Sequence, residues 1–153
     1  MKPNILLTTL NAKYIHLNLA IRILYDLNKD RANLSWKEFT IKTDFDEIAE
    51  CCKEYDIVCF SCYIWNITET LSVAEKIKQL NPHTKILLGG PEVSYEWQNI
   101  INLPHVDFII TGEGEIPFEK FVLNYPDFSK INNLIYKENG EIIYREKTEQ
   151  FDI

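Results

Sequence analysis

The sequence has little of what several large classes of protein require. Its 153 residues include 16 Lys and Arg against 23 Asp and Glu, giving a formal net charge of −7, and no run of basic residues occurs. Without a basic stripe to follow a phosphate backbone, nucleic acid is not an expected partner. No apolar stretch approaches the roughly 20 residues of a membrane-spanning helix, and no signal-peptide pattern opens the chain. We therefore expect a cytoplasmic protein without a membrane partner.

Metal-binding and disulfide patterns are also lacking. The four cysteines lie close together, as Cys51, Cys52, Cys59 and Cys62. Cys59 and Cys62 belong to one predicted strand, where side chains three apart point to opposite faces, so we expect buried, reduced thiols that share no ion. The histidines are scattered, as His16, His83 and His105. No metal site and no catalytic residue is predicted within the chain.

The common nucleotide motifs do not occur. There is no Gly-x-Gly-x-x-Gly after the first apolar run and no Gly-x-x-x-x-Gly-Lys-Ser/Thr, so dinucleotides and P-loop nucleotides have no motif support. A phosphoacceptor domain would need carboxylates after its first and third strands to hold magnesium. Those positions carry Thr8 and Thr9, and Ser61 and Cys62. Nucleotide and phosphoacceptor domains are therefore disfavoured.

What the sequence does contain is a regular alternation of short apolar runs and segments of helical periodicity. We expect strands at residues 4–10, 35–41, 56–61, 85–89 and 106–110, and helices at residues 17–27, 47–54, 68–80, 94–101 and 117–123. Strands that alternate with helices in this way predict an α/β fold, a doubly wound five-stranded parallel sheet of the flavodoxin-like or Rossmann-like kind flanked by helices.

The end of the chain follows another pattern. Residues 133–137 and 141–145 alternate in polarity, and the connection between them contains Asn139-Gly140, a strong signal for a β-hairpin. We expect an α/β domain over residues 1–130, then residues 131–153 as a small antiparallel hairpin and the start of a linker to a further domain. The length fits a single globular core.

Four loops are expected at the carboxyl edge of the sheet, where open parallel sheets bind ligands. Four of the five glycines fall in two of them, and glycine lets backbone approach a ligand closely, although it also serves ordinary turns. The candidate ligand-binding residues, loop by loop, are Leu10, Asn11, Tyr14 and His16; Ser61, Cys62, Tyr63 and Trp65; Gly89, Gly90, Pro91 and Glu92; and Gly112, Glu113, Gly114 and Glu115.

Some of these side chains have two interpretations. Tyr63 and Trp65 could cover a planar macrocycle or pack under a neighbouring loop. Glu113 and Glu115 could contact a ligand, and they also suit the start of a helix. His16 could face a cofactor or lie on the surface.

Together, four segments resemble the N-terminal domain of cobalamin-binding radical SAM proteins. They are Leu7-Thr-Thr-Leu-Asn-Ala-Lys-Tyr-Ile-His16, Phe60-Ser-Cys-Tyr-Ile-Trp-Asn66, Leu88-Gly-Gly-Pro-Glu-Val-Ser94 and Thr111-Gly-Glu-Gly-Glu115. The resemblance implies cobalamin as the cofactor and a radical SAM barrel of the same parent chain as the partner. In that barrel, Cys-x-x-x-Cys-x-x-Cys holds a [4Fe–4S] cluster that cleaves S-adenosylmethionine, which makes methyl transfer one candidate reaction of the parent enzyme. The motif does not occur here, so the chain is not expected to be catalytic alone.

The resemblance also assigns positions and marks one departure. It places Ser61, Gly89 and Gly90 beside the buried nucleotide tail of the cofactor and residues 112–115 along its flank. Mutase-type domains carry Asp-x-His-x-x-Gly, in which the histidine binds cobalt and the aspartate orients it. The segment Tyr14-Ile-His-Leu-Asn-Leu19 keeps the histidine without the acid or the glycine, so His16 is not expected to be a cobalt ligand.

A second hypothesis stays open from the sequence alone. The chain could be a degenerate α/β docking domain that no longer binds cobalamin. That hypothesis predicts a strand-end pocket filled by Tyr63, Trp65 or His16, whereas an open groove there contradicts it. The sequence makes no prediction of the oligomeric state or of the substrate of a parent enzyme.

Overall fold

The computed structural model describes residues 2–12 and 19–145. Its strands are β1 (Asn4–Asn11), β2 (Asn33–Thr40), β3 (Ile57–Ser61), β4 (Lys85–Gly89), β5 (Phe108–Ile110), β6 (Leu134–Glu138) and β7 (Glu141–Tyr144). Its helices are α1 (Leu19–Asn28), α2 (Phe45–Cys52), α3 (Ile67–Leu80), α4 (Pro91–Ile101) and α5 (Glu115–Asn124).

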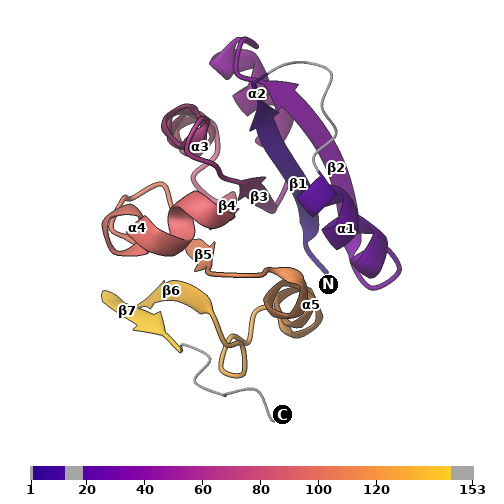
Figure 1. Cartoon of the computed structure of the whole chain (residues 1–153), viewed down its shortest axis with the longest axis vertical. Coiled ribbons are helices and arrows are strands. Elements are labelled where there is room, and N and C mark those ends of the chain that lie inside the picture. Colours follow the sequence, from indigo (N-terminus) through magenta and orange to yellow (C-terminus); the bar gives the residue numbers. More distant parts are fainter. Residues whose placement is uncertain (1, 13–18, 146–153) are drawn as a thin grey trace.

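The strands form one sheet with the order β2-β1-β3-β4-β5-β6-β7 (Figure 1). Strands β1 to β5 are parallel to one another, and the chain winds outward from β1 in both directions. The predicted doubly wound α/β fold is confirmed, and the predicted C-terminal hairpin is present. The hairpin does more than close the domain, because β6 pairs antiparallel with β5 and so extends the same sheet. This pairing covers the edge of β5, which would otherwise expose unpaired backbone groups.

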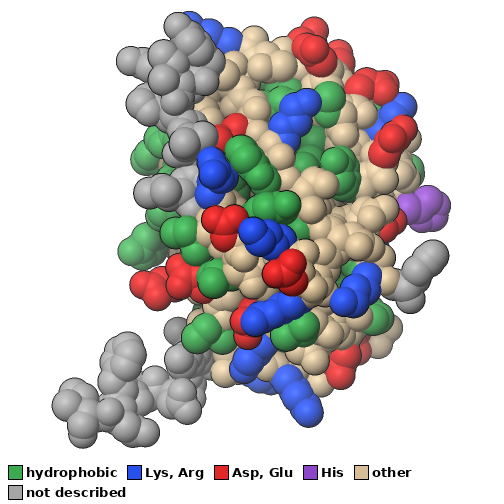
Figure 2. Space-filling model, turned by 90° about the vertical axis from the view of Figure 1, so that its right-hand side faces the viewer, with side chains coloured by type: hydrophobic (Ala, Val, Ile, Leu, Met, Phe, Trp, Pro, Cys, Tyr) green, Lys and Arg blue, Asp and Glu red, His purple; other side chains and the backbone are tan. Residues whose placement is uncertain are grey.

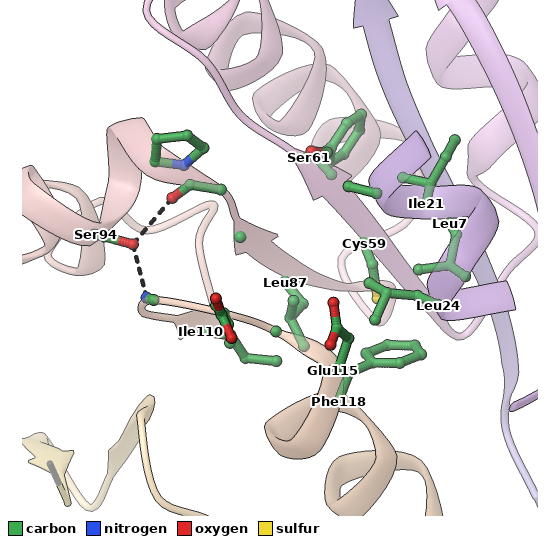
Figure 3. Close-up of a pocket in the computed structure, with 18 of the residues that line it drawn as sticks. Leu7, Ile21, Leu24, Cys59, Ser61, Leu87, Ser94, Ile110, Glu115 and Phe118 are labelled. Carbon is green, nitrogen blue, oxygen red and sulfur yellow. Dashed lines mark hydrogen bonds between the residues drawn. The ribbon is translucent and has the colours of Figure 1, made fainter. Parts of the chain in front are cut away.

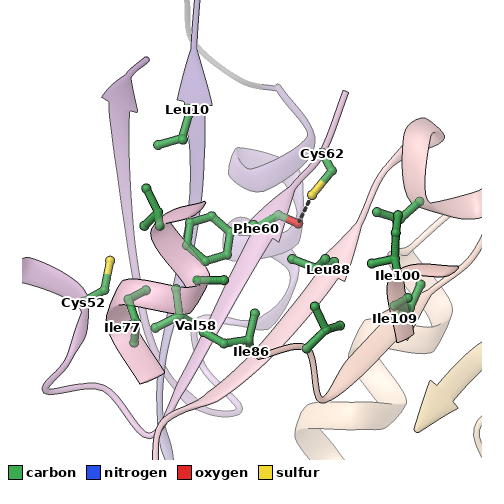
Figure 4. Close-up of a cluster of buried hydrophobic side chains, with 14 of the residues drawn as sticks. Leu10, Cys52, Val58, Phe60, Cys62, Ile77, Ile86, Leu88, Ile100 and Ile109 are labelled. Carbon is green, nitrogen blue, oxygen red and sulfur yellow. Dashed lines mark hydrogen bonds between the residues drawn. The ribbon is translucent and has the colours of Figure 1, made fainter. Parts of the chain in front are cut away.

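One face of the sheet is covered by α2, α3 and α4 (Figure 4). Alternate residues of the central strands, such as Val58, Phe60, Ile86 and Leu88, point to this face and are almost fully buried. Strands buried on both faces read as continuous apolar runs, which explains why the sequence signal for β3 is strong. We call this side the closed face.

The opposite face of the sheet is covered by α1 and α5, which lie side by side across it (Figure 1). Here the intervening strand residues, among them Leu7, Cys59 and Leu87, pack against Ile21 of α1 and Phe118 of α5. We call this side the open face, because a cavity penetrates it. As predicted, Cys59 and Cys62 are both buried and point to different faces of the sheet.

The two helices that follow the glycine loops begin earlier than the periodicity of the sequence indicates. α4 was expected from Ser94 and begins at Pro91, directly after Gly90. α5 was expected from Pro117 and begins at Glu115, directly after Gly114. Proline suits the first turn of a helix and acidic residues suit its positive end, so both starts are chemically reasonable. As a result, each glycine loop leads straight into a helix.

On the face of the molecule shown in Figure 2, Lys and Arg side chains are interleaved with Asp and Glu and form no continuous basic stripe. Among the described residues, no helix is both long enough and apolar enough to cross a membrane. The expectations that the protein is cytoplasmic and binds no nucleic acid stay predictions.

Candidate functional site

A cavity of about 520 Å³ opens at the carboxyl edge of β3, β4 and β5 and runs down the open face of the sheet. Its lining comes from the central strands, from α1, α5 and the first turns of α4, and from the loops that follow β3, β4 and β5 (Figure 3). The volume lies within the range of about 300–1,000 Å³ found for small-molecule sites. Three of the four loops predicted to form a site, those after β3, β4 and β5, therefore converge on one cavity.

Gly89 and Gly90 form one side of the mouth. Gly90 has φ +109°, and a Cβ on it would lie 2.3 Å from the carbonyl oxygen of Cys62, so no other residue fits without moving the backbone. The Cys62 amide donates to the Gly89 carbonyl at 2.7 Å. The backbones leaving β3 and β4 are therefore in direct contact. Gly89 itself lines the cavity, and a Cβ there would meet only the Ile110 carbonyl oxygen, at 4.0 Å.

The second glycine loop is tied to the first by Ser94 of α4. The Ser94 hydroxyl donates to the Gly90 carbonyl at 3.0 Å and accepts from the Gly112 amide at 2.9 Å, as the dashed lines in Figure 3 show. Gly112 has φ +68°, a conformation that favours glycine. One hydroxyl thus fixes the spacing between the two sides of the mouth.

The register of the sheet orders the cavity by depth. Cys59 of β3 pairs with Leu7 of β1 and with Leu87 of β4, so these three residues lie in one row across the sheet. Two residues nearer the carboxyl edge, Ser61 pairs with Gly89 in the next row on the same face. The lower row is apolar apart from one thiol, whereas the upper row carries a hydroxyl and a glycine. The cavity thus has an apolar floor below a more polar mouth.

The loop after β3 is held by a buried amide. Asn66, at the start of α3, is fully buried; its side chain accepts from the Tyr63 amide at 2.8 Å and donates to the Leu10 carbonyl at 3.0 Å. Tyr63 lines the cavity, and its hydroxyl accepts from Ser61 at 3.1 Å. Trp65 stacks on Tyr63 with ring centroids 5.3 Å apart and does not line the cavity. The aromatic pair therefore forms a wall and does not plug the cavity.

The cavity brings together nine of the candidate residues, which are Ser61, Tyr63, Gly89, Gly90, Pro91, Gly112, Glu113, Gly114 and Glu115. The other candidates are placed elsewhere. Leu10 and Cys62 are buried on the closed face, and the side-chain amide of Asn11 donates to Glu38 at 2.8 Å. Glu92 is half-buried and does not line the cavity. Tyr14 and His16 lie outside the described residues, so their assignment stays a prediction.

Sequence reasoning missed the floor and walls of the cavity and the residue that bridges its mouth. The residues that line the cavity and were not predicted include Leu7, Ile21, Leu24, Cys59, Leu87, Ser94 and Phe118. The strand positions were interpreted as core, because a continuous apolar run looks the same whether or not both faces of the strand are fully covered. Ser94 ends the motif Leu88-Gly-Gly-Pro-Glu-Val-Ser94, and its position one helical turn after Gly90 was the available signal.

The charge of the cavity lining is acidic. Glu113 and Glu115, both exposed, are the charged residues among its described lining, which includes no Lys or Arg. Burial raises the pKa of the Cys59 thiol, so the floor presents a neutral S–H. The described residues contain no cluster of His, Cys, Asp or Glu able to hold a metal ion. These features favour a neutral, partly apolar ligand over a free phosphate or a bare cation.

The family model for the B12 binding domain matches residues 5–122, which include every described residue that lines the cavity. The chain belongs to this family. The resemblance found in the four sequence segments is thereby confirmed, and cobalamin is the cofactor that the family implies.

Several curated and solved proteins are similar to this B12 binding domain. The cobalamin-dependent radical SAM methyltransferase TokK of Streptomyces tokunonensis is 28% identical over 109 residues, which cover 68% of this chain and 16% of TokK. An uncharacterized methyltransferase of Pyrococcus horikoshii is 29% identical over 104 residues, which cover 64% of this chain and 23% of that protein. The chain therefore corresponds to a small part of these relatives.

Among solved structures, the radical S-adenosylmethionine methyltransferase TsrM of Kitasatospora setae, with cobalamin and a [4Fe–4S] cluster bound, has the same fold. The TM-score is 0.76 at 14% identity, and the match covers 97% of this chain and 29% of TsrM. The structural match thus covers more of the chain than the family model, which ends at residue 122.

Proposed function

We propose that this domain holds cobalamin for a radical SAM enzyme, with the nucleotide tail of the cofactor in the cavity and the corrin ring over its mouth. The observation that carries this proposal is the glycine-lined mouth above an apolar floor. A mouth edged by Gly89, Gly90, Gly112 and Gly114 leaves backbone open to a ligand. At about 520 Å³, the cavity suits the tail and is too small for the whole cofactor.

The residues of the site would divide the work by depth. Leu7, Cys59 and Leu87 would exclude water from the base at the end of the tail. Gly89 and Gly114 would let the sugar and phosphate linkage pass close to the backbone. Ser61 would offer a hydroxyl beside it. Cobalamin, when bound, supplies a cobalt centre that can carry a methyl group, and the protein supplies its position and surroundings.

The wider assignment follows from the relatives. TokK and TsrM are named radical SAM methyltransferases, and the three-cysteine motif for an iron–sulfur cluster does not occur in these 153 residues. We therefore propose that cleavage of S-adenosylmethionine and methyl transfer belong to a radical SAM barrel of the same parent protein. The present domain would bind and orient the cofactor toward that barrel.

The docking-domain hypothesis is less well supported. It requires Tyr63, Trp65 or His16 to fill the cavity, whereas Tyr63 lies on the wall and Trp65 lies outside the lining. His16 lies outside the described residues.

The proposal is tested by titrating the purified chain with hydroxocobalamin and with cobinamide, which lacks the nucleotide tail. We expect a change in the visible spectrum of the corrin and a rise in Tm with cobalamin, and binding of cobinamide that is weaker by about tenfold or more. No spectral change, no retained colour and no thermal shift with hydroxocobalamin would refute the proposal. Equal affinity for both corrinoids would show that the tail does not use the cavity.

Gly89→Val is the variant that addresses the cavity directly. Gly89 shares a face with Leu87, and a Cβ on it has no close neighbour, so valine should fill the mouth and leave the fold intact. We expect cobalamin affinity to fall to the level of cobinamide. Ser35→Val, which adds the same side chain to the exposed Ser35 on β2, serves as the control and should bind cobalamin normally.

A further inference from the structure

The floor of the cavity offers a ligand almost no hydrogen bonds from side chains. Leu7, Cys59 and Leu87 form the floor, and the surrounding walls are aliphatic or aromatic, from Ile21, Leu24 and Phe118 (Figure 3). Polar side chains lie toward the mouth, where Ser61 occupies the upper row and Glu113 and Glu115 are exposed. The part of a ligand that reaches the floor must therefore be one that loses little free energy when it is buried without a hydrogen-bond partner.

Cys59 is the one member of the floor with a polar hydrogen. Its thiol is 4% exposed, and burial raises its pKa, so the group stays neutral and is a weak donor. The buried side-chain oxygens without a partner in the described residues are Thr8 Oγ1, Asn28 Oδ1 and Thr70 Oγ1, and none of these residues lines the cavity. The side chains of the described floor thus include no strong donor or acceptor that lacks a partner.

We propose that the cavity selects among cobamides by the base at the end of the nucleotide tail, favouring benzimidazole and phenol bases over purines. This inference rests on the proposed function, because it assumes that the tail enters the cavity. It adds the chemical class of cofactor that the site accepts and names position 59 as one whose low polarity maintains that preference.

The discrimination follows from the edges of the bases. A benzimidazole or a phenol ring can present carbon edges to the floor. Adenine carries ring nitrogens and an exocyclic amine around its periphery, and in this floor those groups lose water without gaining a comparable partner. A site that leaves a buried polar group unpaired discriminates strongly against it.

The test compares two cobamides, one with a p-cresolyl base and one with adenine, in equilibrium binding to the 153-residue chain. We expect the p-cresolyl form to bind at least about tenfold more tightly, because one buried polar group without a partner costs about that much or more. Release of the base from cobalt differs between free cobamides. That difference belongs to the free ligands and cancels when the same two ligands are compared between protein variants.

Cys59→Ser supplies the matched comparison, because it replaces the thiol with a hydroxyl of similar size that is a stronger donor and acceptor. We expect the affinity ratio to narrow by about threefold or more in favour of the adenine cobamide. Cys59→Ala removes the thiol without adding a polar group and should leave the ratio near its wild-type value. Circular dichroism of both variants establishes that they fold.

The outcomes separate this inference from the function on which it rests. Equal or tighter binding of the adenine cobamide by the wild-type chain, or an unchanged ratio in folded Cys59→Ser, overturns the selectivity and leaves cobalamin binding in place. Failure of every cobamide and of cobinamide to bind overturns the proposed function itself. A p-cresolyl preference that narrows in Cys59→Ser but not in Cys59→Ala supports the inference.

Discussion

The two faces of the central sheet are built from similar apolar residues, but one face is fully covered and the other contains a cavity. On the closed face, α2, α3 and α4 cover the sheet, and Phe60 and Leu88 are packed on all sides. On the open face, α1 and α5 are the described helices that lie over the parallel strands, and the cavity remains between them and the sheet. The difference indicates that one face maintains the fold while the other is left incomplete for a ligand.

Two neighbouring leucines on β4 test whether the closed face and the open face differ in packing. Leu88 points to the closed face and Leu87 toward the cavity. Leu88→Ala should lower the free energy of unfolding by about 3–5 kcal/mol, whereas Leu87→Ala should cost about 2 kcal/mol, because part of its surface already faces a hollow. Urea unfolding of both variants without cofactor measures the two losses. Equal losses would mean that both faces are equally packed.

The two glycine loops sharpen the comparison at the mouth. Gly90→Ala combines φ +109° with a Cβ 2.3 Å from the Cys62 carbonyl oxygen, so we expect a loss of about 3 kcal/mol in the free energy of unfolding. Gly112→Ala has a positive φ without a neighbour within 4 Å, and should cost only about 1 kcal/mol. Thermal unfolding ranks the two variants. The reverse order would contradict the assignment of Gly90 as the close-packed position.

Ser94 connects the faces, because its helix packs on the closed face and its hydroxyl holds the two loops of the mouth. Ser94→Ala removes two hydrogen bonds and should cost about 1–2 kcal/mol of stability. It should also accelerate cobalamin dissociation, as measured by exchange against excess cobinamide. Ser94→Thr retains the hydroxyl and should restore the slow dissociation. A merely structural serine would change Tm and leave the dissociation rate unaltered.

The smallest expected difference between the two faces lies in how their buried thiols make the free energy of unfolding depend on pH. Burial raises the pKa of Cys52 to about 12 and raises the pKa of Cys59 and Cys62 as well. Above the ordinary thiol pKa of 9.0 the unfolded chain loses these protons while the folded chain keeps them, so the free energy of unfolding should fall as pH rises. The slope is at most about 1.4 kcal/mol per pH unit for each thiol.

Urea unfolding between pH 8 and pH 11, a window of about three units around the thiol titration, measures this loss in the wild type and in Cys→Ala variants. Cys62→Ala on the closed face should flatten the pH dependence. If Cys59→Ala leaves it unchanged, water in the cavity already solvates that thiol, and the two faces differ in hydration as well as in packing.

Most of the architecture could be predicted from local patterns. The apolar run at Ile57–Ser61 and the glycines after β4 and β5 identified the strands, their direction and the edge at which a site would form. The helix starts at Pro91 and Glu115 were displaced by a few residues, because the start of each helix is set by a glycine turn and not by apolar spacing. Pairing of the hairpin with β5 is a tertiary choice that no local signal encodes.

The depth of the site could not be predicted in the same way. Leu7, Cys59 and Leu87 carry the pattern of ordinary core residues, and only the placement of α1 and α5 decides that they face a cavity. The loops were predictable because several glycines gather at the carboxyl ends of neighbouring strands. A leucine gives no such signal, since it suits a filled core and an apolar ligand site equally well. The sequence therefore indicated residues at the mouth of the cavity, whereas the residues of its floor were interpreted as ordinary core.

The hairpin connects Arg145, the last described residue, to the mouth of the cavity through hydrogen bonds. The Asn133 amide donates to the Arg145 carbonyl at 2.8 Å, and the Thr111 amide donates to the Asn133 carbonyl at 2.9 Å. Thr111 directly precedes Gly112, and its hydroxyl lies 3.2 Å from that of Tyr144. Two backbone hydrogen bonds therefore connect Arg145 to the residue before Gly112. A displacement of the backbone at Arg145 would be transmitted through them to the Gly112 turn at the mouth of the cavity.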